Sequence, residues 1–129
     1  MADEPITITG WPLVEIHFNG PASDAQVQAW LDTMDQLLAR QSPFGLLTAT
    51  GPDSDFAEAG RRAMGIWFRQ NRQPLQQFCV GVARVAPNQQ AIQRLAGPKM
   101  QAAMPCPIFA SVERAEALAW LQAKLPGAQ

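Results

Sequence analysis

His17 is the only histidine in the chain, so any acid–base chemistry near neutral pH would depend on it. Glu15 lies two residues earlier, on the same face of a predicted strand, where its carboxylate could orient the imidazole ring. The sequence predicts no serine or cysteine nucleophile beside this pair. We therefore interpret His17 as a solvated or partly packed strand residue. The scarcity of acid–base and nucleophilic residues favours a binding protein over an enzyme.

Four arginines form the second group of residues with a chemical role to consider. At about 100° per residue they fall within roughly a quarter-turn of one helix, on the side opposite Trp67. Because the apolar side of this helix must face the core, we expect the arginines to share one outward face. Such a face predicts association with an acidic partner or with a second copy of the chain. The residues concerned are Arg61, Arg62, Arg69 and Arg72.

Charge is unevenly distributed along a chain whose net charge is −1. Residues 1–60 carry nine acidic side chains and one basic one, whereas residues 61–100 carry seven basic side chains and no acidic one. The two regions either neutralise each other across the folded surface or leave a basic surface for an anion or an acidic partner. Aromatic side chains do not share the arginine face, so nucleic acid is not an expected partner.

The sequence also lacks the motifs of disulfide-rich, metal-binding, nucleotide-binding and membrane-spanning proteins. Cys79 and Cys106 are too few for a disulfide framework and have no neighbouring histidines, so we expect cytosolic thiols and no metal site. Without a G-x-G-x-x-G or Walker motif, no nucleotide cofactor is expected. No apolar stretch approaches the ~18 residues of a membrane span. The acidic residues 1–5 do not resemble a signal peptide.

The arginines are expected on a helix that follows a buried strand. Residues 44–50 are apolar or small at nearly every position, which is typical of a strand covered on both faces. Gly51-Pro52 ends this strand, and Asp55 with Glu58 resembles a capping box that starts the helix. Pro74 is expected to end the helix.

Hydrophobic periodicity assigns the rest of the chain. A capping box at Ser23 and Gln26 starts the clearest helix. Small residues around Gly81 would let a helix approach closely or leave room for a ligand. The predicted strands are 6–9, 13–18, 44–50, a segment within 75–85, and 108–110. The other predicted helices are 23–40, one between Asn88 and Gly97, a further turn at 99–104, and 112–125.

Strands that alternate with helices predict an α/β protein. We expect one domain over residues 1–129, with a mixed, mostly parallel sheet of about five strands and four main helices. The first two strands should form an antiparallel edge. A chain of this length can bury a core of its own.

Two packing motifs carry a family resemblance. They are V-E-I-H-F-N-G at residues 14–20 and F-A-S-V-E-R-A-E-A-L-A-W-L at residues 109–121. With the predicted layout, the chain resembles the SpoIIAA-like proteins, which share the STAS fold of anti-anti-sigma factors and are grouped with Sec14/CRAL-TRIO lipid carriers. The resemblance covers residues 6–125. It implies a bacterial, cytoplasmic regulatory protein.

The resemblance also implies a regulatory serine. Anti-anti-sigma factors carry a phosphorylatable serine, usually in a D-S-S-G-like run, where the third strand meets the second helix. Ser54, between Asp53 and Asp55, is the hydroxyl that matches this position. The serine pair and the following glycine are absent here, and nearby acids would repel a phosphate. Ser54 is therefore read either as a helix-cap or loop serine or as a regulatory site.

The expected function is that of a non-enzymatic binding or regulatory module. It would act through protein–protein contacts of the 51–55 loop and the arginine-rich helix, with a protein partner or by self-association. The alternative is a small-molecule or lipid carrier, or an enzyme, that uses a pocket between the sheet and the helices near Gly81.

Overall fold

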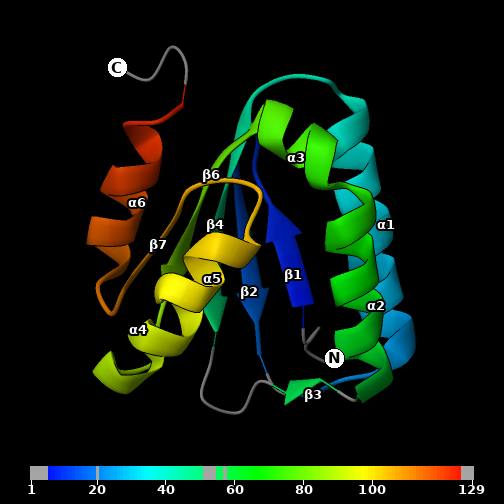
Figure 1. Ribbon diagram of the computed structural model, residues 1–129, viewed down its shortest axis with the longest axis horizontal. Coiled ribbons are helices and arrows are strands. Elements are labelled where there is room, and N and C mark those ends of the chain that lie inside the picture. Colours follow the sequence, from blue (N-terminus) through cyan, green and yellow to red (C-terminus); the bar gives the residue numbers. More distant parts are fainter. Residues whose placement is uncertain (1–5, 20, 51–54, 57, 126–129) are drawn as a thin grey trace.

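The computed structural model describes residues 6–19, 21–50, 55–56 and 58–125, which form a sheet with helices on both faces (Figure 1). The elements in chain order are β1 (Ile6–Thr9), β2 (Leu13–Phe18), β3 (Pro21–Ala22), α1 (Asp24–Ala39), β4 (Phe44–Thr50), β5 (Asp55–Phe56), α2 (Glu58–Gln70), α3 (Arg72–Phe78), β6 (Cys79–Val85), α4 (Gln89–Ala96), α5 (Pro98–Ala103), β7 (Ile108–Ser111) and α6 (Arg114–Gln122).

The main sheet has five strands in the order β1-β2-β4-β6-β7. β1 pairs antiparallel with β2, and every other neighbouring pair is parallel. The predicted α/β class, strand number and antiparallel edge are confirmed. Strand β4 lies in the middle, and residues 44–48 are all buried, as expected for a strand covered on both faces.

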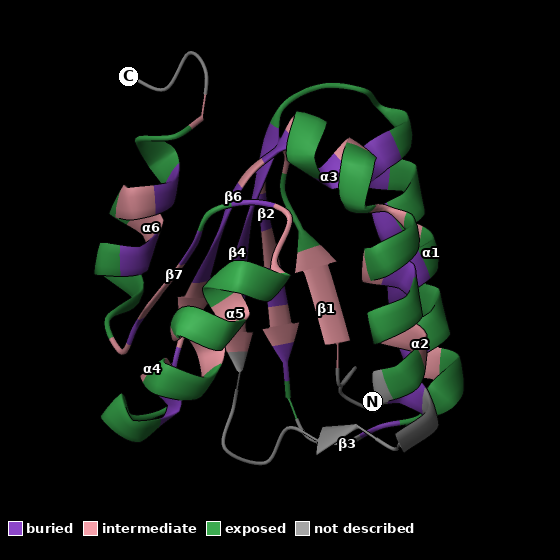
Figure 2. Cartoon of the chain, in the orientation of Figure 1, coloured by how far each residue is buried: buried purple, intermediate pink, exposed green. Residues whose placement is uncertain are grey.

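The two faces of the sheet carry cores of different size. On one face, α1 and α3 pack on the sheet and α2 packs on α1, and together they bury residues such as Met34, Phe44 and Leu75. On the other face, α6 alone packs on β4 and β6, with Leu121 and Ala117 against Leu47 and Ala83. Figure 2 shows the buried residues concentrated where these elements meet. The second face is therefore only partly covered.

The predicted single helix between β4 and β6 is wrong, because two helices occupy this region. α2 ends at Gln70, and Asn71 separates it from α3, where the side-chain Nδ2 of Asn71 donates to the carbonyl oxygen of Trp67 at 2.9 Å. Pro74 is the third residue of α3, where a missing N–H costs little because first-turn N–H groups have no helical partner. Residues 75–78 are therefore helical, and the strand begins at Cys79.

Three smaller predictions also need correction. Asp55 is not a helix cap, because it lies in β5, which pairs parallel with β3 in a separate two-stranded sheet. The predicted number of four main helices is too low, because α2 and α3 are separate helices and residues 98–103 form α5. The last helix begins at Arg114 rather than at residue 112, because Ser111 belongs to β7 and its hydroxyl accepts from the backbone N–H of Glu113 at 3.0 Å.

Candidate functional site

The outward face of α2 presents two arginines with an isoleucine between them. Arg62 and Arg69 are exposed, and Ile66, with 38% of its surface exposed, is the one exposed large apolar side chain among the described residues. Gly65 lies on the same side, and a Cβ atom added there would meet nothing within 4 Å. We call Arg62, Ile66 and Arg69 the arginine surface. It joins positive charge to an accessible apolar centre.

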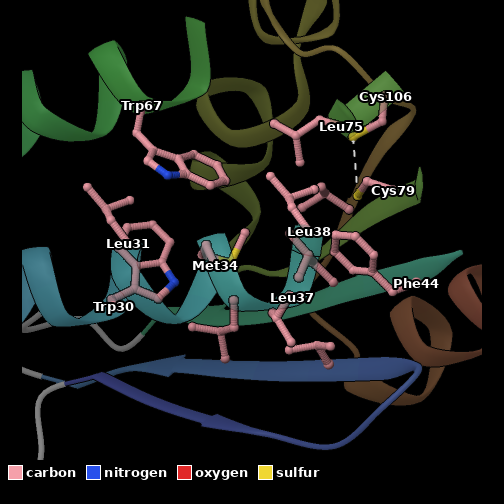
Figure 3. Close-up of a cluster of buried hydrophobic side chains, with 14 of the residues drawn as sticks. Trp30, Leu31, Met34, Leu37, Leu38, Phe44, Trp67, Leu75, Cys79 and Cys106 are labelled. Atoms are coloured by element: carbon pink, nitrogen blue, oxygen red, sulfur yellow. Dashed lines mark hydrogen bonds between the residues drawn. The ribbon is translucent and has the colours of Figure 1, made fainter. Parts of the chain in front are cut away.

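The opposite side of α2 fixes this orientation. Trp67 is only 7% exposed, and its indole N–H donates to a carboxylate oxygen of Asp35 on α1 at 2.7 Å. Gly60 lets α2 approach α1 closely, because a Cβ there would lie 3.2 Å from the side chain of Val27. Figure 3 shows the Trp67 ring directed toward α1. The expectation that Trp67 is a core residue is confirmed, and it lies on the side opposite Arg62 and Arg69.

Arg72 does not belong to the arginine surface, contrary to the sequence prediction. It is the first residue of α3, and its guanidinium donates to the carbonyl oxygen of Ala103, at the end of α5, at 3.2 Å. The break at Asn71 changes the direction of the chain between Arg69 and Arg72, which a continuous helical wheel cannot represent.

The other predicted contact residues are less fully described. Asp53 and Ser54 lie outside the described residues. Asp55 is placed in β5 and Arg61 in α2, but their side chains are not described. Of the residues predicted to bind a partner, Arg62 and Arg69 are therefore the pair that the structure brings to one surface.

The predicted pocket near Gly81 is filled by an aromatic ring. A Cβ atom at Gly81 would lie 2.9 Å and 3.0 Å from two ring carbons of Trp120 on α6. The same ring stacks on Phe109 of β7, with centroids 5.3 Å apart. The glycine therefore serves close helix packing, which is the other role that its small size allowed.

An open hollow lies instead between β1 and α1. Its volume is about 280 Å³, and its walls are partly apolar. The indole N–H of Trp30 is buried and has no hydrogen-bond partner among the described residues. The hollow is lined by Ile6, Ile8, Gln26, Ala29, Trp30 and Thr33.

Glu15 and His17 do interact, and they are joined by an arginine that the sequence did not predict. His17 Nε2 lies 2.7 Å from one carboxylate oxygen of Glu15. Arg114 of α6 donates to both oxygens of the same carboxylate. Its Nη2 atom lies 2.6 Å from Oε1 of Glu15, and its Nε atom lies 3.2 Å from Oε2. Its bidentate geometry is the strong form of an arginine–carboxylate bond. No spacing rule could find a partner 99 residues away.

This cluster has the electrostatics of an ion-pair network. The bond from Arg114, followed by the bond from His17, lowers the pKa of Glu15 below its ordinary value despite the opposing effect of burial. Glu15 in turn raises the pKa of Arg114. Within the described part of the chain, Glu15 is the residue that hydrogen-bonds to His17. Thr7 of β1 lies opposite His17 in the sheet, but no hydrogen bond joins its hydroxyl to the ring. The cluster therefore holds α6 to β2, and no nucleophile is hydrogen-bonded to its histidine among the described residues.

Groups of three or more histidine, cysteine, aspartate or glutamate side chains that could hold a metal ion are absent from the described residues. None of the helices described here has the length and apolar character needed to cross a bilayer.

Comparison with known proteins found no matching family model, no matching curated protein and no matching solved structure.

Proposed function

We propose that the chain is a non-enzymatic binding module that docks a protein partner through the arginine surface of α2. The observation that carries this proposal is the alignment of exposed Arg62, Ile66 and Arg69 along one helix face. Arginine and exposed apolar side chains are characteristic of protein–protein contacts. A partner with acidic side chains around an apolar centre would complement this surface.

The distance between Arg62 and Arg69 further specifies the partner. Seven residues of helix place Arg62 and Arg69 about 10 Å apart along the axis. A partner helix or strand that carries acids at that distance could lie against both arginines while an apolar side chain covers Ile66. Because an exposed ion pair contributes only about 0–1 kcal/mol, binding must be collective and must weaken with salt.

The resemblance to SpoIIAA-like, STAS-fold proteins supports a regulatory form of this function. In the sequence Ser54 comes four residues before the first residue of α2, and the N–H groups of a helix N-terminus attract anions such as a phosphate. The carboxylates of Asp53, Asp55 and Glu58 would oppose it. In this proposal Ser54 is the regulatory position, the chain acts in the cytoplasm, and a second copy is one acceptable partner.

A site-specific crosslink tests the docking surface. We would place a photoreactive benzoylphenylalanine at Gln70, an exposed residue next to the arginine surface. Irradiation in an extract of the source cells should join the chain to a partner, and mass spectrometry should map the adduct to an acidic segment. Arg62→Glu with Arg69→Glu should abolish the adduct, and high salt should weaken it.

The matched control reverses two other exposed charges. Arg94→Glu with Lys99→Glu changes net charge equally on α4 and α5, and the adduct should persist. Sedimentation of the purified chain at low and high salt tests whether the partner is a second copy. An adduct that survives reversal of Arg62 and Arg69 in a folded protein, or that maps to a segment without acids, would rule out the proposed surface.

A small-molecule or lipid carrier is the second candidate, and the hollow between β1 and α1 favours it. Its volume of about 280 Å³ is close to the lower end of ligand pockets. An apolar ligand would suit walls that include Ile6, Ile8 and Trp30.

Medium-chain fatty acids provide a direct probe of the carrier function. Decanoate should raise the melting temperature of the parent protein, because a ligand that binds the folded state stabilises it. Ala29→Trp would fill the hollow and remove the effect, whereas Ala25→Trp, on the same helix but outside the lining, should keep it. Equal effects of decanoate on the two variants would exclude this site.

A further inference from the structure

Two thiols that are 27 residues apart in the sequence face each other in the larger core. Cys79 is the first residue of β6, and Cys106 lies between α5 and β7. Their Sγ atoms are 3.5 Å apart, and Figure 3 shows them pointing toward one another beside Leu75. Cys79 is 3% exposed and Cys106 is 8% exposed. The pair is therefore shielded from the bulk solvent, with Cys106 the more accessible member.

A partly buried arginine, Arg84, is close enough to Cys106 for their charges to interact. Arg84 of β6 is half-buried, and its Nε atom is buried without a hydrogen-bond partner within the described part of the chain. The charged groups that act on it are Arg94 and Cys106. A buried charge is costly unless a counter-charge compensates it. Arg94 carries the same sign as Arg84, so the Cys106 thiolate is the compensating group that the described structure offers.

The two thiols are chemically unequal. The bond with Cys79, assisted by the charge of Arg84, lowers the pKa of Cys106 despite burial. The bond with Cys106 and burial raise the pKa of Cys79 well above its ordinary value. Cys106 therefore loses its proton first, and the Cys79 thiol can donate to the resulting thiolate. A reactive thiolate beside a second thiol is the usual arrangement of a redox-sensitive pair.

We propose that Cys106 and Cys79 are a redox-active pair, in which Cys106 reacts with a hydroperoxide and Cys79 then closes an intrachain disulfide. This inference does not depend on the α2 surface.

The reaction balances with one molecule of hydroperoxide. The Cys106 thiolate attacks a peroxide oxygen, the O–O bond breaks, and the leaving hydroxide or alkoxide takes up a proton, which leaves a sulfenic acid on Cys106. The Cys79 sulfur then attacks the Cys106 sulfur, the S–O bond breaks, and the hydroxyl group leaves as water with the Cys79 proton. Two thiols are oxidised by two electrons, and the peroxide is reduced by two.

The required movement is small. A disulfide bond is about 2.05 Å long, so the two sulfur atoms must approach by about 1.5 Å. Cys106 lies between Pro105 and Pro107, outside any helix or strand, where a local shift breaks no regular hydrogen-bond ladder. Side-chain rotation at Cys106 can therefore supply most of the approach.

Intact mass measurement after peroxide treatment tests the proposal. The folded protein, given a slight excess of hydrogen peroxide and then alkylated in denaturant, should lose about 2 Da, the mass of two hydrogen atoms. Both thiols should resist alkylation, and a digest should contain one linked peptide pair with Cys79 and Cys106. Protein unfolded in urea should react more slowly. Failure of the folded protein to lose two hydrogens, or formation only of crosslinked dimers, would overturn the proposal.

Single substitutions separate the two roles. Cys79→Ser should trap a sulfenic acid on Cys106 that dimedone labels, whereas Cys106→Ser should leave Cys79 unlabelled. Equal labelling of the two variants would contradict the assignment. Circular dichroism checks that both variants fold.

The role of Arg84 has two independent readouts. Arg84→Gln should slow oxidation at pH 7, and Arg84→Lys should restore part of the rate. In the parent protein, where Cys79, Arg84 and Arg94 are the titratable groups that act at this site among the described residues, the rate should reach half its maximum below pH 9.0, the ordinary pKa of a cysteine thiol. A midpoint at or above that value would overturn the role given to Arg84 even if the variants fail to fold.

Discussion

Replacement of Trp67 by alanine tests the orientation of α2 on which the arginine surface depends. A tryptophan side chain buries about 200 Å², which corresponds to about 5 kcal/mol at 25 cal/mol per Å². Core aromatic truncations cost about 3–5 kcal/mol, and Trp67 is 7% exposed, so we expect a loss in that range. For a chain of this length the melting temperature should fall by roughly 10–20 °C.

A double-mutant cycle isolates the bond between the Trp67 indole and Asp35. Trp67→Phe keeps most of the ring but removes the N–H that donates to Asp35 at 2.7 Å. Because Asp35 is exposed and water competes for its carboxylate, the bond should contribute about 1 kcal/mol. Asp35→Ala should therefore cost about 1 kcal/mol in the parent protein and almost nothing in the Trp67→Phe background.

Urea and thermal unfolding followed by circular dichroism would measure both effects. Ile66→Ala is the matched control, because Ile66 is a neighbouring apolar residue on the exposed side of α2, and it should cost only about 0.5 kcal/mol. The orientation of the helix would be wrong if Trp67→Ala melted within a degree of the parent. It would also be wrong if Ile66→Ala lowered the free energy of unfolding more than Trp67→Ala does.

Three further predictions concern other parts of the molecule. Gly81→Val should destabilise the protein by about 1–3 kcal/mol, because the added carbons would collide with Trp120, and a urea titration would measure the loss. Glu15→Gln should weaken the dependence of stability on pH in acid. The pKa of Glu15 is lowered in the folded state, chiefly by Arg114, so its contribution is present above the ordinary value of 4.5 and lost as pH falls through the lower folded value. If the free energies of unfolding of the parent and the variant changed in parallel with pH below pH 5, this prediction would be wrong. Ser54→Ala should cost about 1 kcal/mol or less, and loss of a biological activity at unchanged stability would instead support the regulatory role.

The sequence was sufficient for the elements whose patterns are local. The run of apolar or small residues at 44–50 predicted the central strand with its observed bounds. The capping box at Ser23 is present, with Gln26 donating its backbone N–H to the serine hydroxyl and accepting from the Ser23 N–H. Asn88 likewise caps α4 by accepting from the N–H of Ala91 at 3.0 Å. In each case the decisive contacts span only a few residues.

Features that depend on distant residues were missed or misread. A helical wheel assumes one straight axis, so the break at Asn71 removed Arg72 from the predicted face. Gly81 signalled close approach, but only the folded chain identifies Trp120 as the group that fills the space. Neither the Arg114–Glu15 bond nor the meeting of Cys79 with Cys106 follows from spacing, because the sheet order brings those residues together.

The reliance of one sheet face on α6 has a consequence for synthesis of the protein. The helices from α1 to α5 are made before β7, so the larger core can begin to form while the chain is still being translated. The opposite face of β4 and β6 stays bare until Leu121 has left the ribosome, since Leu121 and Ala117 are the buried residues of α6 that cover it. During that interval Leu47 and Ala83 form an exposed apolar strip, which makes the nascent chain a substrate for chaperones and prone to aggregation.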